Sequence, residues 1–222
     1  MSHRHLLTLL GMVLIAIGLF ERGWLLPGVW LGCDFLALPI AHARGAHRVF
    51  GKRSDGSLPF WSWLAFLPLL LYTSAVWHIV RVFSREPPHN TVTDDLVVGR
   101  RLLPGELDDE FANYVDLTAE FVEPASIRRS GGYQCFPILD GAAPDPDALC
   151  GAVDRLSPGR TFIHCAQGHG RTGLFALAVL LKSGAARTVD EGLQMLQAMR
   201  PGICLNRAQR RCIDIIAVGL NT

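Results

Sequence analysis

Residues 161–173 read Thr-Phe-Ile-His-Cys-Ala-Gln-Gly-His-Gly-Arg-Thr-Gly, and they carry most of the information about the fold of this chain. A short strand-like run enters a loop that contains glycine, and the loop leads into the apolar helical run 174–181. Backbone N–H groups of such a loop converge on an anion, and the positive end of the helix dipole adds to the attraction. The segment therefore predicts a phosphate-binding loop between a strand and a helix.

Two side chains of this loop add chemistry to it. Arg171 offers a planar fork of donors to two phosphate oxygens. Cys165 lies where a helix N-terminus and a guanidinium favour the thiolate over the thiol. A thiolate held beside a bound phosphate is a nucleophile, so the loop predicts attack on phosphorus.

His164-Cys165, five residues and then Arg171-Thr172-Gly173 resemble the signature of the cysteine-dependent protein tyrosine phosphatase superfamily. The resemblance extends over residues 95–215 and is greatest to the dual-specificity phosphatases. Residues 115–120 resemble the strand and turn that precede the acid loop of these enzymes, and residues 133–141 resemble the segment that carries their general acid.

The resemblance implies roles for particular residues. Cys165 is expected to be the nucleophile, with Arg171 and the loop holding the phosphate. The implied phosphate-binding residues are Ala166, Gln167, Gly168, His169, Gly170 and Arg171. His164 is expected to help hold the thiolate, or else to be a plain core histidine. His169 is expected at the pocket mouth, where solvation of the loop is the alternative reading.

Two polar residues after the arginine have an implied role and an ordinary alternative. Thr172 would assist the sulfur during hydrolysis of the phosphocysteine, or cap the helix N-terminus. Gln209 would position the hydrolytic water, or be an ordinary polar residue of a helix. Both residues are retained as candidate site residues.

Three carboxylates are candidates for the general acid of the predicted site. Cleavage of a phosphate ester requires a proton for the leaving oxygen, and a carboxylic acid on a loop supplies it. Asp140 is the first choice, although it precedes Cys165 by only 25 positions, which is shorter than the resemblance leads one to expect. Asp145 and Asp147 are alternatives, and Asp140 alternatively forms only an Asp-Gly turn.

The predicted reaction is hydrolysis of a phosphomonoester through a phosphocysteine intermediate, without a metal or other cofactor. A phosphoprotein is the first choice of substrate, in a protein tyrosine or dual-specificity activity. The alternative is a lipid phosphatase acting on phosphatidylglycerophosphate or a related phospholipid. Two other classes compatible with the sequence are an inactive membrane protein that binds phosphorylated partners and a membrane scaffold that acts through Asp34.

The remainder of the C-terminal part predicts the fold class. Strands are expected at 96–98, 114–117, 136–139 and 161–164, and helices at 171–183, 189–199 and 206–218. Strands that alternate with helices indicate an α/β fold with a largely parallel sheet. The domain is expected to occupy residues 94–222, after a linker at 85–93 that contains Pro87 and Pro88.

Residues 1–84 are expected to form a membrane region of two to three helices. Apolar runs occupy 6–20, 24–43 and 58–80, and the third is long enough to cross a bilayer without a charged residue. The connection before it carries Arg44, Arg48, Lys52 and Arg53, which predicts that the connection is cytoplasmic. With all three runs crossing, the catalytic domain would lie in the periplasm of a bacterium, attached to the inner membrane.

Composition excludes several other classes of protein. The chain has 222 residues, is 50% hydrophobic and carries a net charge of +1, so neither disorder nor a nucleic-acid partner is expected. Six cysteines in a chain of this length do not indicate a disulfide scaffold. The scattered Asp, His and Cys residues predict no metal site. The sequence does not indicate an oligomeric state.

Overall fold

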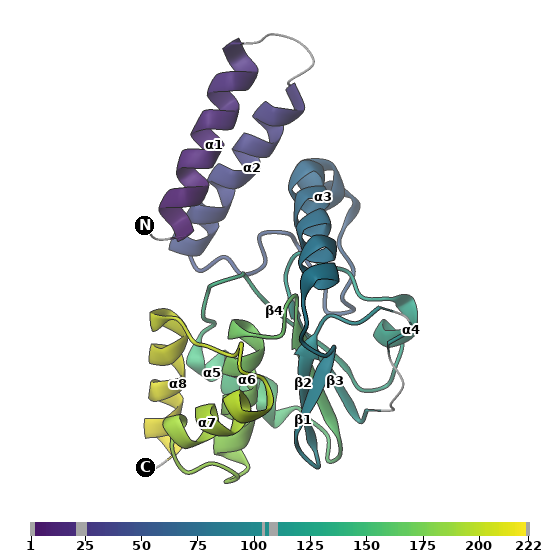
Figure 1. Ribbon diagram of the computed structural model, residues 1–222, viewed down its shortest axis with the longest axis vertical. Coiled ribbons are helices and arrows are strands. Elements are labelled where there is room, and N and C mark those ends of the chain that lie inside the picture. Colours follow the sequence, from purple (N-terminus) through teal and green to yellow (C-terminus); the bar gives the residue numbers. More distant parts are fainter. Residues whose placement is uncertain (1–2, 21–25, 104, 107–110, 221–222) are drawn as a thin grey trace.

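The computed structural model describes residues 3–20, 26–103, 105–106 and 111–220. Three apolar helices come first and lie above an α/β domain formed by the remainder of the chain (Figure 1). The C-terminal domain contains the segment 161–173, so its architecture positions the candidate site.

A five-stranded sheet forms the centre of the α/β domain. Its spatial order is β1-β2-β5-β3-β4, with β2, β5, β3 and β4 parallel and β1 antiparallel at one edge. The strands are β1 (His89–Thr93), β2 (Leu96–Arg100), β3 (Asn113–Thr118), β4 (Tyr133–Ile138) and β5 (Thr161–Cys165). The predicted α/β class with a mostly parallel sheet is confirmed. Because parallel strands share one carboxyl edge, the ends of β3 and β5 meet there.

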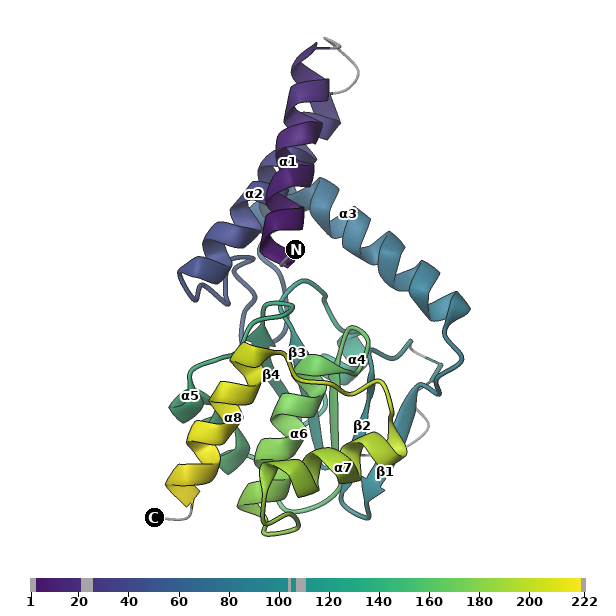
Figure 2. The same ribbon diagram turned by 60° about the vertical axis from the view of Figure 1, so that its left-hand side comes forward.

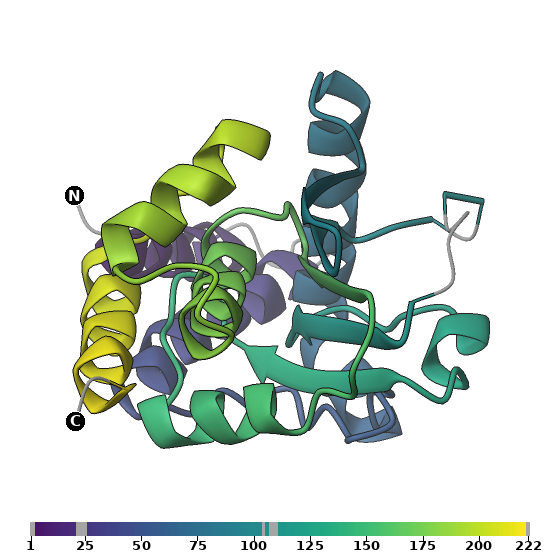
Figure 3. The same cartoon turned by 90° about the horizontal axis from the view of Figure 1, so that it is seen from below.

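More helices cover one face of the sheet than the other (Figures 2 and 3). They are α4 (Ala125–Arg128), α5 (Pro146–Asp154), α6 (Gly170–Lys182), α7 (Val189–Met199) and α8 (Arg207–Leu220). The main core contains residues of α5 to α8 and alternate residues of the central strands, such as Val98 and Ile163. Phe162 points to the other face, where it packs with Tyr114 and with Ile127 of α4. This alternation is the period-two pattern of a sheet buried on both faces.

The linker predicted at 85–93 is shorter in the structure, because its second half forms a strand. Residues 89–93 form the edge strand β1 and pair antiparallel with β2. The tract 89–93 is polar, but it contains three β-branched residues in five, which suits an edge strand. The short helices α4 and α5 were also not predicted, because each has too few residues for a periodic apolar pattern to be recognised.

The helices α1 (His3–Phe20) and α2 (Leu26–Ala43) form an antiparallel pair that points away from the domain (Figures 1 and 2). Gly11 and Gly32 lie at their contact, where a Cβ atom on either residue would lie 2.8 Å from the carbonyl oxygen of the other. Small residues at such a contact let two helix backbones approach closely. Trp24 and Leu25, which begin the predicted second run, lie outside the described residues.

Of the helices in the described part of the chain, one is long and apolar enough to cross a membrane, namely α3 (Phe60–Phe83). The expectation of two to three spanning helices is therefore supported for one. The apolar part of α1, His5–Phe20, is shorter than α3 and is not among the helices long enough to cross a membrane. In α2, Asp34 and Pro39 interrupt the apolar run, and Asp34 is buried.

Both ends of α3 are attached to the α/β domain. Before the helix, Lys52 is buried in the domain, where its ammonium lies 2.7 Å from Asp116 Oδ2. After the helix, residues 84–88 lead directly into β1, and α3 runs obliquely over the domain (Figure 2). The connection 44–59 and the domain are thus in contact. The prediction that a membrane separates them does not agree with the structure, because Lys52 finds its counter-ion inside the domain.

Candidate active site

The loop between β5 and α6 begins at Cys165, the last residue of β5, which is buried. Gly168 has a φ of 76°, and a Cβ atom there would lie 2.4 Å from the backbone of Gly99. Only glycine fits such a position without displacing the neighbouring strand. The amide N–H of Gly168 points back and donates to Cys165 Sγ at 3.3 Å. The glycine therefore shapes the loop around the sulfur.

Arg171 lies in the first turn of α6 and is 2% exposed. Its Nη1 and Nη2 donate to Glu120 at 3.0 and 2.9 Å, and Nη1 also donates to the carbonyl of Ile138. Burial alone would lower the pKa of Arg171, but the carboxylates of Glu120 and Asp140 raise it well above its ordinary value. The buried Nε has no hydrogen-bond partner among the described residues. A positioned cation with a free donor is suited to bind a phosphate oxygen.

Glu120 is a residue of the candidate site that the sequence interpretation did not single out. It follows β3 and forms the bidentate pair that orients Arg171. An acid directly after a strand that ends at the catalytic edge was the available signal. Its partner could not be identified before the fold placed β3 beside β5.

Asp140 lies close to Arg171, with Oδ1 at 3.2 Å from Nη2, and its side chain is 74% exposed. It lines the same cavity as Cys165. Asp145, by contrast, caps the N-terminus of α5 by accepting from the amide of Ala148 at 3.0 Å. Asp147 is in the first turn of α5, and neither alternative acid lines that cavity. The geometry favours Asp140 as the acid that can reach a leaving group.

His164 is fully buried behind the loop, with Nδ1 at 3.4 Å from the carbonyl oxygen of Cys165. Burial lowers the pKa of His164 to about 4, although Asp116 at 3.9 Å opposes this shift. The ring is therefore neutral at pH 7 and contacts Cys165 through its backbone. It also stacks on Phe162, at 5.6 Å between ring centroids.

Thr172 and Gln209 are both buried next to the loop. The hydroxyl of Thr172 has no hydrogen-bond partner among the described residues. The N-cap of α6 is His169, so Thr172 does not have the alternative role of helix cap. Gln209 donates to the carbonyl of Ala142 at 3.2 Å and accepts from the amide of Asn206 at 3.1 Å. It packs near Gly170 but does not line the cavity, so its amide connects the acid segment to α8.

Arg200 is a second residue whose importance the sequence did not reveal. It is 1% exposed, and its guanidinium donates to the carbonyl oxygens of Gln167 and Gly168, both at 2.9 Å. Glu86 accepts from His169 at 2.7 Å and lies 3.1 Å from Arg200. These contacts fix the outer side of the phosphate-binding loop to the segment that follows α3.

A cavity of about 490 Å³ opens over the loop. Its polar lining gathers the predicted residues Cys165, Ala166, Gln167, His169, Gly170 and Arg171 with Glu120 and Asp140. The other walls come from the three N-terminal helices. Trp77 of α3 reaches the loop itself, since its Nε1 donates to the carbonyl of Ala166 at 2.9 Å. That the apolar helices complete the cavity was not apparent from the sequence pattern.

Asp116, Glu123 and His164 approach one another closely enough to hold a cation. Each carboxylate already faces a basic side chain, because Lys52 pairs with Asp116 and Arg101 donates to Glu123 at 2.7 Å. Burial alone would raise the pKa of Asp116, but the Lys52 ammonium holds it well below its ordinary value. The chemistry of this cluster is that of a buried ion-pair network.

No protein-family model matches the sequence, and no curated protein matches it. Solved structures do match its C-terminal part. Tk-PTP in its active form has a TM-score of 0.53 and 22% identity over 60% of this chain and 97% of its own. PTPMT1 in complex with PI(5)P has a TM-score of 0.52 and 12% identity over 61% of this chain and 97% of its own. Human DUSP28 has a TM-score of 0.51 and 17% identity over 61% of this chain and 98% of its own.

These matches show that the domain has the fold of the protein tyrosine and dual-specificity phosphatases. They cover nearly the whole of each matched structure but only about three fifths of this chain. The fold and the loop together support the general class of phosphatase.

Proposed function

We propose that this chain is a membrane-attached phosphatase that hydrolyses phosphomonoesters through a phosphocysteine intermediate. The thiolate of Cys165 attacks phosphorus, the bond from phosphorus to the ester oxygen breaks, and Asp140 gives that oxygen its proton. Water then attacks the phosphocysteine and gives a proton to Asp140, which releases inorganic phosphate and the thiolate. Arg171 and the loop amides stabilise the equatorial oxygens in both steps.

The observation that carries this proposal is the meeting of three side chains in one cavity. Cys165 ends a strand, Arg171 begins the following helix, and Asp140 arrives from the loop after β4. Glu120 fixes the guanidinium, so the cation is held in place before a substrate arrives. Such preorganisation is what electrostatic stabilisation of a transition state requires. The neutral His164, and the hydroxyl of Thr172, which has no partner in the described part of the chain, support the roles that the resemblance implies.

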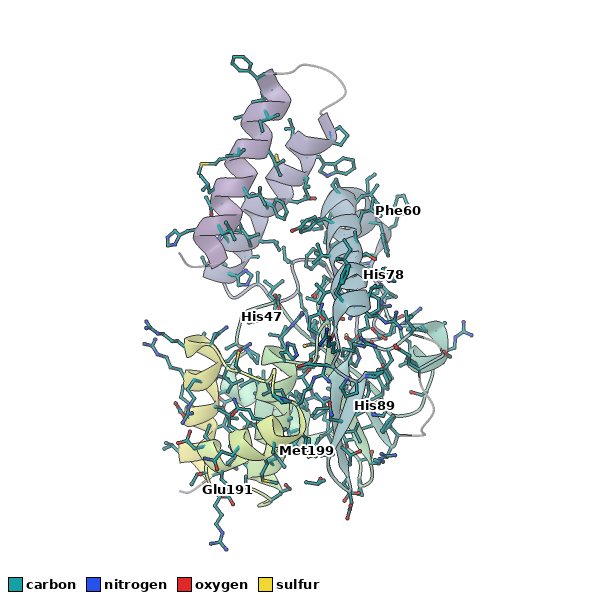
Figure 4. All side chains as sticks on the ribbon, in the orientation of Figure 1. His47, Phe60, His78, His89, Glu191 and Met199 are labelled. Atoms are coloured by element: carbon teal, nitrogen blue, oxygen red, sulfur yellow. The ribbon has the colours of Figure 1, made fainter. Side chains whose placement is uncertain are left out.

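The apolar helices are the proposed means of membrane attachment. The outer side of α3 is apolar and exposed along its length, for example at Phe60 and Phe83. Figure 4 shows Phe60 near the end of α3 far from the domain and His78 closer to it. Although α3 is long and apolar enough to cross a membrane, both of its ends are attached to the domain, so we place α3 along the membrane surface and the α1–α2 pair within the bilayer. The basic connection 44–59 then lies on the cytoplasmic side together with the catalytic domain.

The test is phosphate release from p-nitrophenyl phosphate by the full-length protein in detergent. Cys165→Ser is expected to lower kcat more than about 1,000-fold, since the hydroxyl is a far weaker nucleophile than the thiolate. Cys150→Ser, on α5, is the matched control and is expected to retain activity. Turnover by Cys165→Ser near the wild-type rate would disprove the mechanism.

A protein that only binds phosphorylated partners is the other class to separate from this proposal. Wild-type protein that binds vanadate but releases no phosphate in a single turnover would identify that class. Phosphate release in that experiment supports the enzyme. The nucleophile, the arginine and the acid all line the cavity, which favours catalysis.

A further inference from the structure

Two chemically different groups of residues line the cavity over the phosphate-binding loop. The polar group includes Cys165, Arg171 and Asp140, together with His42 of α2, whose Nε2 lies 2.7 Å from the carbonyl oxygen of Asp140. We call the apolar part of the lining the apolar arm. It comprises Leu7, Leu38, Phe50, Leu69, Tyr72, Thr73, Val76, Trp77, Val80, Phe121 and Leu139. A ligand that contacts both parts must combine a phosphate with a hydrocarbon portion.

One face of α3 forms the longest wall of this apolar arm. Residues 69, 72, 73, 76, 77 and 80 have the spacing of a single helical face, and all of them line the cavity. At a rise of 1.5 Å per residue, this face extends over roughly 16 Å. Trp77 attaches the face directly to the loop by donating to Ala166. The arm is therefore continuous with the catalytic centre, and it is partly open along α3, where Tyr72, Val76 and Val80 are exposed.

The opposite wall comes from the helix pair. Leu38 lies on α2 and Leu7 on α1, and both line the cavity. The arm thus lies between α3 and the α1–α2 pair, which are the segments proposed to contact the membrane. A hydrocarbon chain can enter it without first crossing water, which would cost about 0.8 kcal/mol for each methylene.

We propose that the substrate is a lipid phosphomonoester whose hydrocarbon chain occupies the apolar arm while its phosphate lies at Cys165. This inference rests on the proposed function and assigns its substrate class. The ester oxygen that leaves is then the lipid's own alcohol oxygen, and Asp140 protonates it. A phosphoprotein is disfavoured, because the lining that α2 and α3 contribute is mostly apolar, which suits a hydrocarbon chain better than the polar N–H and C=O groups of a peptide backbone.

The test compares kcat/KM of the full-length protein for four soluble phosphates at one detergent concentration. They are dioctanoyl phosphatidic acid, glycerol 3-phosphate, a phosphotyrosine peptide and p-nitrophenyl phosphate. The first two share a headgroup and differ only in their acyl chains. Burial of those chains in the arm is expected to raise kcat/KM about 100-fold for the lipid over glycerol 3-phosphate.

Two tryptophan variants locate the effect on one face of α3. Val76→Trp fills the apolar arm and is expected to lower the ratio of lipid to p-nitrophenyl phosphate activity about 10-fold or more. Leu71→Trp changes an exposed residue that does not line the cavity, and it should leave that ratio unchanged. A second filling variant, Leu38→Trp on α2, repeats the test from the opposite wall.

The outcomes separate this inference from the proposed function. A chain-dependent preference that Val76→Trp removes and Leu71→Trp retains supports the inference. Activity on p-nitrophenyl phosphate with equal rates for lipid and glycerol 3-phosphate, or with the peptide preferred, overturns the inference and leaves the phosphatase in place. Inactivity towards all four compounds overturns both.

Discussion

Asp140 differs from the other charged residues of the site in its exposure. Arg171 is buried, whereas the Asp140 carboxylate is largely open to the cavity while it touches the guanidinium. An acid must reach the leaving oxygen and later accept a proton from water, which requires access from the substrate side. Arg171 is thus held in place by its surroundings, whereas Asp140 is open to the side from which a substrate binds.

Replacement of this acid gives a graded prediction. Asp140→Asn is expected to lower kcat about 100-fold for an alkyl phosphate, whose leaving oxygen needs a proton. The loss should be much smaller for p-nitrophenyl phosphate, which leaves readily as an anion. Asp145→Asn is the matched control, because asparagine also caps a helix well. The assignment fails if Asp145→Asn loses activity and Asp140→Asn does not.

Among the secondary-structure elements, Lys52 attaches the connection between α2 and α3 to β3. The ammonium of Lys52 contacts Asp116 Oδ2 at 2.7 Å and donates to the carbonyl and hydroxyl oxygens of Thr118. Both members of the ion pair are inaccessible to solvent. Removal of one partner from a buried pair leaves the other charge uncompensated.

Lys52→Met is therefore expected to destabilise the protein by about 3–5 kcal/mol at pH 7. The neighbouring Arg53→Met is the control and should change stability by no more than about 0.5 kcal/mol, since Arg53 is exposed. The measurement is the midpoint of thermal unfolding in detergent.

The same variant has a predicted pH dependence. Lys52 holds the pKa of Asp116 below its ordinary value, so the pair stabilises the wild type above the unfolded pKa of about 4. That contribution disappears as the pH falls through the folded pKa. The difference between wild type and Lys52→Met should therefore be largest at neutral pH and smaller below about pH 4. A difference that does not vary with pH would contradict the ion-pair account.

In the whole molecule, the connection 44–59 contacts the α/β domain through Lys52, so the proposed membrane attachment puts both on the same side of the membrane. Asp55 in the connection and Asp154 in the domain are both exposed, with 62% and 63% of their side chains accessible. Asp55→Cys and Asp154→Cys should therefore react together with a membrane-impermeant maleimide. We expect reaction in inside-out vesicles and not in intact spheroplasts, with the labelled peptide identified by mass spectrometry. Labelling of the two cysteines from opposite sides would contradict the arrangement.

Periodicity and motif spacing were enough to predict the α/β class of the C-terminal domain and its largely parallel sheet. The predicted helix 189–199 has the boundaries that the structure shows, where Thr188 caps its N-terminus. Cys165 and Arg171 were found because strand, loop and helix are adjacent in sequence. Arg200 and Glu120 were not found as site residues, since each acts across a contact between segments far apart in the chain.

By itself, the sequence determined the phosphate-binding loop, the α/β class and the apolar nature of the first third of the chain, because these depend on local spacing and composition. Tertiary structure decided three further features: the bidentate pair of Glu120 with Arg171, the burial of Lys52 in the domain, and the apolar arm that α3 builds over Cys165. Each depends on the distance between segments that are separated in the chain. Hydropathy alone reports that a helix avoids water, whereas packing decides whether that helix faces lipid or lines a catalytic cavity.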